Sequence, residues 1–156
     1  MNSLSKLLIL LFLGFFLIQM PSWAQNHEIV KQFVAASNKL NWQEAAACLD
    51  KKYKSEQCDK LLNGDFEKFM NELYCGQILD ASGAASNDYS CPGTSKIKKI
   101  EYESTSDFEV VNKKIKLASV YFVVHTSDGK KIRMTLSLKE VKKLFGKKAT
   151  LIGSMG

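Results

Sequence analysis

Residues 116–138, KLASVYFVVHTSDGKKIRMTLSL, decide the fold of this chain. Two runs rich in β-branched and aromatic residues flank the dipeptide Asp128-Gly129, which is typical of two-residue hairpin turns. Such a turn pairs residues whose numbers sum to 257, so Tyr121 is predicted to lie opposite Leu136. The stretch therefore predicts two long antiparallel strands joined by a tight bend.

Side chains alternate between the two faces of a strand, so the predicted register sorts this hairpin into two faces. The face expected to lie beneath helices carries Leu117, Ser119, Tyr121, Val123, His125, Ile132, Met134, Leu136 and Leu138. The opposite face carries a stripe of Val120, Phe122 and Val124, with Arg133 beside it. Because a monomer rarely exposes such a stripe to water, we expect these four residues to form an interface with a protein partner or a second copy of the chain.

The rest of the chain divides into helices before residue 81 and strands after residue 95. Apolar residues recur at helical spacing over residues 27–40, 42–49 and 66–74, and Ser55 can begin a further helix that ends near residue 62. Residues 81–95 are rich in Gly, Ser and Ala and are predicted to form a loop. Alternating patterns then predict strands over residues 97–103, 108–111, 116–126, 130–138 and 149–153. The sequence therefore predicts an α+β domain, with N-terminal helices packed on a curved, cone-like antiparallel sheet of four to five strands.

The first 24 residues read as a secretory signal peptide rather than as part of the fold. Lys6 precedes an apolar run over residues 7–18, and Ser22 and Ala24 supply the small residues of a cleavage site after Ala24. The run is too short to cross a bilayer as a helix, and no later segment is long and apolar enough to do so. We therefore expect a secreted or periplasmic protein whose residues 25–156 form a single domain.

Four cysteines, an even number, suggest disulfide bonds in an exported domain. They allow three pairings, and the sequential one, Cys48 with Cys58 and Cys75 with Cys91, closes the shortest loops. No Cys-x-x-Cys motif is present, and the two histidines lack the spacing of metal ligands, so neither a metal nor another cofactor is expected.

Positive charge is concentrated at the C-terminal end. Residues 129–156 contain eight Lys or Arg residues and one acidic residue, Glu140. Nucleic acid is disfavoured as a partner because the protein is predicted to be exported, contains a single Arg, and has no aromatic residues interleaved with these lysines. Two readings stay open: a lysine-rich strand edge that resists pairing with other sheets, or a site for an anionic partner such as lipid headgroups or acidic glycans.

Residues 27–49 and 97–153 resemble the nuclear transport factor 2-like superfamily of cystatin-like α+β proteins, in particular its small exported bacterial members. The resemblance is carried by Ile29-Val30-Lys31-Gln32-Phe33-Val34-Ala35-Ala36, Tyr121-Phe122-Val123-Val124, Ser127-Asp128-Gly129-Lys130 and Leu136-Ser137-Leu138 before a final strand. It implies a pocket between the helices and the concave sheet, and frequent dimerisation through the outer sheet face. It does not imply a reaction, because the superfamily includes isomerases, dehydratases and binding domains.

Few polar groups interrupt the face predicted to line that pocket. We therefore expect a non-catalytic domain that binds a small apolar ligand or a protein partner, with Ser119, Tyr121, His125 and Met134 as ligand-binding residues. The alternative is an isomerase or dehydratase that uses His125 as its general base, since an imidazole titrates near neutral pH. The predicted register places no carboxylate beside His125, and such a neighbour would favour the enzyme.

Overall fold

The computed structural model of the protein describes residues 22–144 and 146–153. These residues form an α+β structure in which helices come first and an antiparallel sheet follows. The predicted leader, residues 1–24, lies outside the described residues except for Ser22, Trp23 and Ala24, which begin the first described helix. Among the described helices, none is long and apolar enough to cross a membrane.

Polar caps set the limits of the helices. Helix α2 (Ser22–Asn38) is followed by a turn in which Leu40 has a φ of 56°. Asn41 then caps α3 (Trp42–Ala47) by accepting a hydrogen bond from the Glu44 amide. Helix α4 (Lys51–Lys54) continues as a π-helical segment, η1 (Ser55–Leu61). Helix α5 (Phe66–Leu73) is the amphipathic helix that the spacing predicts, and it buries Phe69, Met70 and Leu73.

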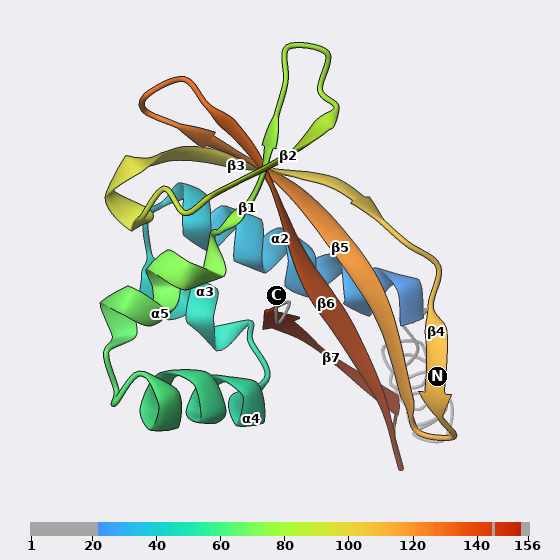
Figure 1. The fold of residues 1–156 in the computed structure, drawn as a ribbon. Coiled ribbons are helices and arrows are strands. Elements are labelled where there is room, and N and C mark those ends of the chain that lie inside the picture. The colour runs from blue at the N-terminus through green and yellow to red at the C-terminus, as the bar shows by residue number, and fades with distance from the viewer. Residues whose placement is uncertain (1–21, 145, 154–156) are drawn as a thin grey trace, which may run out of the picture.

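In the described part of the chain, seven strands form one antiparallel sheet, more than the four to five predicted. They are β1 (Gly76–Leu79), β2 (Ala85–Ser90), β3 (Ile97–Thr105), β4 (Glu109–Asn112), β5 (Ile115–Thr126), β6 (Lys131–Lys143) and β7 (Gly146–Gly153). The long strands β5 and β6 lie at the centre (Figure 1). Strands β3 and β4 pair with successive parts of β5, while β1 and β7 pair with successive parts of β6.

The extra strands come from segments without an alternating pattern. Residues 85–90, predicted to be loop, form β2, whose side chains are mostly exposed on both faces, so no period of two marks them. The lysine-rich residues 139–148 are not a connection between strands either. They complete β6 and begin β7, which pair with each other from Leu136 and Gly153 to Lys143 and Gly146.

The predicted register of the central hairpin is wrong by one residue. Val120 lies opposite Leu136 and Phe122 opposite Met134, so paired numbers sum to 256. The bend contains three residues rather than two, because the Thr126 amide donates to the Lys130 carbonyl and the Gly129 amide donates to the Thr126 carbonyl. Gly129 alone in this bend has a positive φ, 83°, as in a type I turn followed by a glycine bulge.

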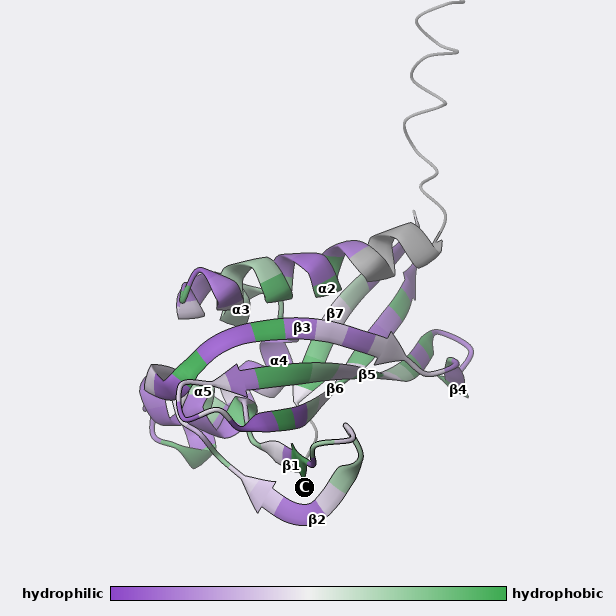
Figure 2. Ribbon diagram, turned by 90° about the horizontal axis from the view of Figure 1, so that it is seen from above, coloured by the Kyte–Doolittle hydropathy of each residue, from purple (hydrophilic) through white to green (hydrophobic). Residues whose placement is uncertain are grey.

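This shift moves the side chains of β5 to the other face of the sheet. Val120, Phe122 and Val124 are fully buried beneath the helices, and they pack there with Met134 and other side chains of β6. The interface predicted at Val120, Phe122 and Val124 is therefore wrong. Seen from above, α2 lies along the face of the sheet that these residues occupy (Figure 2).

Aromatic rings join the helices to that face. Phe33 of α2 contacts Phe122 with ring centroids 5.5 Å apart, and it stacks on Tyr74 at 6.0 Å. The buried Tyr74 hydroxyl is 2.7 Å from the buried Ser37 hydroxyl, so both polar groups are satisfied inside the core. Residues of α5 belong to the same apolar cluster as β6, so packed side chains occupy the space where the resemblance implies a pocket.

One of the two sequential disulfides is present. Cys75, two residues after the end of α5, is bonded to Cys91, directly after β2. Cys48 and Cys58 are buried thiols, and burial followed by the charge of Glu44 raises the pKa of Cys48 to about 11. A disulfide of this kind is typical of proteins in oxidising compartments.

Candidate functional site

The four residues predicted to bind a ligand do not share one site. Met134 is fully buried in the core, whereas Ser119, Tyr121 and His125 lie on the outer face of the sheet and are half-buried. The register shift explains the separation, because it turns the predicted residues of β5 outward and leaves those of β6 inward. No shared pocket of these four residues exists.

His125 has a carboxylate partner that the sequence did not indicate. Its Nε2 lies 2.7 Å from Oε2 of Glu101, which also accepts a hydrogen bond from Lys99. The contact arises because β3 pairs with β5 and brings Glu101 opposite Val123, two pairs along from the Lys99–His125 pair and therefore on the same face of the sheet. The hydrogen bonds from Lys99 and then from His125 lower the pKa of Glu101. A carboxylate that orients an imidazole is a feature of general-base sites.

Arg133 also lies on the outer face, where a carboxylate holds it. Its Nε and Nη2 donate to the two oxygens of Glu103 over 2.8 and 2.6 Å. Glu103 occupies the bulge of β3, between the pairs of Tyr102 and Ser104 with β5. This bidentate pair joins β6 to β3 across β5. The guanidinium of Arg133 is thus already bonded to a carboxylate of its own chain.

A cleft of about 390 Å³ lies between the connection from α3 to α4 and the β6–β7 hairpin. Above it, Leu49 forms a parallel bridge to Leu151, which closes the edge of β7 at that point. The walls of the cleft come from α2, the end of α3, the start of α4, β6 and β7. The residues that line it are Ile29, Ala47, Leu49, Asp50, Lys51, Lys52, Lys139, Val141, Lys143, Lys148, Ala149 and Thr150.

Asp50 is the one acidic residue among these and is already engaged. It caps α4 by accepting from the amides of Lys52 and Tyr53. Its other oxygen lies 3.1 Å from Nζ of Lys139 and 3.4 Å from the Thr150 hydroxyl. Burial by itself raises the pKa of this carboxyl, but the hydrogen bond from Lys139, the two amides and the charge of Lys139 outweigh it and lower the pKa.

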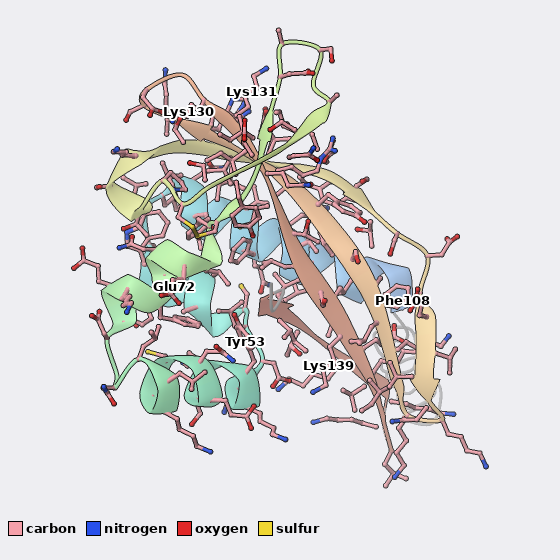
Figure 3. The ribbon with its side chains drawn as sticks, in the orientation of Figure 1. Tyr53, Glu72, Phe108, Lys130, Lys131 and Lys139 are labelled. Carbon is pink, nitrogen blue, oxygen red and sulfur yellow. A yellow bond between two sulfur atoms is a disulfide. The ribbon has the colours of Figure 1, made fainter. Side chains whose placement is uncertain are left out.

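The lysines of the cleft therefore outnumber their anionic partners. Lys139 is paired with Asp50, and the exposed Lys52 is 3.8 Å from Glu56. Within the described residues, Lys51, Lys143 and Lys148 form no ion pair. Apolar side chains lie among these ammonium groups, so the cleft combines a positive field with apolar contact area. Figure 3 shows Lys139 in the lower part of the view, away from the bend at Lys130 and on the side of Tyr53.

A second, smaller groove lies between α2 and β3. It has a volume of about 320 Å³ and is lined by Val30, Lys31, Val34, Ala35 and Tyr102. The hydroxyl of Tyr102 is 3.1 Å from that of Thr105, at the edge of the sheet. This groove is almost wholly apolar and offers a ligand little to orient it.

The sequence did not single out the cleft because its members are far apart in the chain. Asp50 and Lys139 are 89 residues apart, and β7 brings them together. The excess of lysine after residue 128 was the one available signal. No group of three or more potential metal ligands occurs within the described part of the chain. No protein-family model matches the chain, and no curated protein matches it.

Proposed function

We propose that the protein is an exported, non-catalytic domain that binds a small amphipathic anion in the cleft beside β7. The observation that carries the proposal is the composition of the cleft, five lysines and one paired carboxylate around apolar side chains. A ligand with an acidic head and a short apolar body matches both features. The volume of the cleft lies at the lower end of the range for small-molecule sites.

Export is supported by the leader-like residues 1–24 and by the Cys75–Cys91 disulfide. Cleavage after Ala24 would release a secreted or periplasmic domain. Membership of the nuclear transport factor 2-like superfamily is supported by the long α2 on the inner face of an antiparallel sheet. The ligand site proposed here differs from the central pocket that this resemblance implies, because core side chains occupy that region.

Calorimetry with decanoate tests the proposed ligand class. Two control compounds each lack one feature: decanol has the alkyl chain without the negative charge, and acetate has the charge without the long alkyl chain. We expect decanoate to bind about tenfold more tightly than either, since both the charge-assisted contacts and the apolar contacts contribute. The double variant Lys143→Gln, Lys148→Gln should weaken decanoate binding by a similar factor. The control Lys96→Gln, Lys98→Gln lies outside the cleft and should bind as the wild type does. Equal affinity for decanoate and decanol would refute the proposal.

A second candidate, an isomerase or dehydratase with His125 as its general base, is favoured by the 2.7 Å contact between His125 and Glu101. Its test is the incorporation of deuterium next to the carbonyl of a small cyclic ketone in D₂O, followed by NMR. A general base would give exchange that His125→Ala abolishes and Glu101→Gln reduces. Exchange no faster in the wild type than in His125→Ala would eliminate this candidate.

A further inference from the structure

Two turns meet at the end of the sheet away from the central bend. The turn between β4 and β5 carries Lys113 and Lys114, and the β6–β7 hairpin ends beside it (Figure 1). The Lys142 amide donates to the Lys114 carbonyl over 2.8 Å, which joins the two turns directly. We call this surface the basic end.

Lysines from both turns give the basic end a strong positive charge. They are Lys113, Lys114, Lys116, Lys142, Lys143, Lys147 and Lys148. The acidic residues of the same strand segments are Glu109 and Glu140, and Glu140 lies 2.9 Å from Nζ of Lys147. Within the described residues, the other six lysines form no ion pair.

Aliphatic side chains are exposed among these lysines. Leu144, at the tip of the β6–β7 hairpin, is 90% exposed, and Val110 and Val111 of β4 are 68% and 56% exposed. Lysines and projecting aliphatic groups at one end of a molecule favour the boundary between anionic headgroups and acyl chains.

We propose that the basic end docks the protein on an anionic lipid bilayer, with Leu144 in the acyl boundary and the lysines on the headgroups. A glycan or another polyanion would satisfy the lysines but would give the aliphatic groups no apolar contact. This inference does not rest on the proposed ligand, since Lys114, Lys142 and Leu144 do not line the cleft.

Vesicle co-sedimentation tests the proposal with the folded protein, using phosphatidylcholine with and without phosphatidylglycerol. We expect binding to the anionic vesicles alone, and weaker binding as salt increases. Lys114→Glu combined with Lys142→Glu should weaken that binding by roughly tenfold or more, because each lysine near the surface contributes. The matched control is Lys130→Glu combined with Lys131→Glu, at the opposite end of the sheet (Figure 3), and it should bind as the wild type does.

Leu144→Ser separates a bilayer from a simple polyanion. We expect it to weaken vesicle binding several-fold and to leave the salt dependence and heparin binding unchanged. Unchanged vesicle binding by Leu144→Ser would overturn the proposal, and so would equal binding to the two vesicle types or an equal loss in the control variant. Circular dichroism establishes that each variant is folded. Decanoate binding by these variants should match the wild type, so failure of this proposal and failure of the proposed ligand are distinguishable.

Discussion

At the scale of single residues, a few polar or small groups hold distant segments together. Asp50 links the start of α4 to β6 and β7 through its backbone and both carboxylate oxygens. Asn38 of α2 binds the edge of β3 in a similar way, since its side chain donates to the Ile100 carbonyl and accepts from the Ile100 amide. The cap by Asp50 satisfies amides at the start of α4, and Asn38 satisfies the amide and carbonyl of Ile100 at the outer edge of β3.

Replacement of Asp50 should reveal two separate contributions. Asp50→Ala removes the cap and the ion pair, and we expect it to cost about 1–2 kcal/mol at neutral pH. Asp50→Asn keeps a good cap and removes only the charge, so its cost should be smaller. Chemical denaturation of the three proteins measures both values.

The pH dependence of these variants follows from the lowered pKa of Asp50. A carboxyl whose pKa is lower in the folded state stabilises that state above its unfolded pKa, about 3.9, and loses this effect as the pH falls through the folded value. The difference between wild type and Asp50→Asn should therefore be full at neutral pH and should vanish in strong acid. A difference that stays constant with pH would contradict the assigned role.

Gly76 permits the close approach of β1 to β6. A Cβ atom at this position would lie 2.2 Å from the carbonyl oxygen of Arg133, which is backbone and cannot move aside cheaply. We expect Gly76→Ala to cost about 1–3 kcal/mol because β1 must shift away from β6. Thermal unfolding measures the loss, and Gly83→Ala, where a Cβ atom meets nothing within 4 Å, separates this crowding from backbone strain.

At the scale of elements, the disulfide fastens the β1–β2 hairpin to the rest of the molecule. Cys75 and Cys91 flank this hairpin, which contacts the sheet through β6. The bridge closes a loop with a sequence separation of 16. The hairpin has mostly exposed side chains and little apolar burial of its own, so the covalent bond compensates for weak packing.

Removal of the bridge should therefore weaken the whole fold. We expect the free energy of unfolding of the double variant Cys75→Ser, Cys91→Ser to be about 3 kcal/mol lower than that of the oxidised wild type. Reduction of the wild type should have the same effect. Cys48→Ser serves as a control for thiol loss, and a disulfide variant as stable as the oxidised protein would show that the hairpin holds without the bond.

At the scale of the whole molecule, the sheet has a covered face and an open face. The covered face contains Phe122, which is fully buried and contacts Phe33. The open face contains Tyr121, which is half-buried on the outer surface. Dimerisation through the outer face stays a proposal, and residues such as Tyr121 and Val123, rather than Val120, Phe122 and Val124, would supply its contacts.

Adjacent substitutions should therefore behave very differently. Phe122→Glu buries an unpaired charge in the core and should lower stability by about 4 kcal/mol or more, enough to unfold the protein. Tyr121→Glu should leave the protein folded. If the wild type is a dimer through its outer face, light scattering after size-exclusion chromatography should report a dimer for the wild type and a monomer for Tyr121→Glu. A folded Phe122→Glu variant would contradict the observed register.

Local signals in the sequence predict the helices, the long hairpin and the basic character of the C-terminal end, because caps, turn residues and hydrophobic period act within a few residues of one another. Asn41, Asp65 and Gly129 mark their boundaries in this local way. The buried face of β5 depends instead on packing in the folded molecule, because two-residue and three-residue bends both suit an Asp-Gly pair and differ by one step of register. The same holds for the Glu101–His125 and Asp50–Lys139 contacts, which join residues 24 and 89 positions apart and depend on strand pairing that no local pattern encodes.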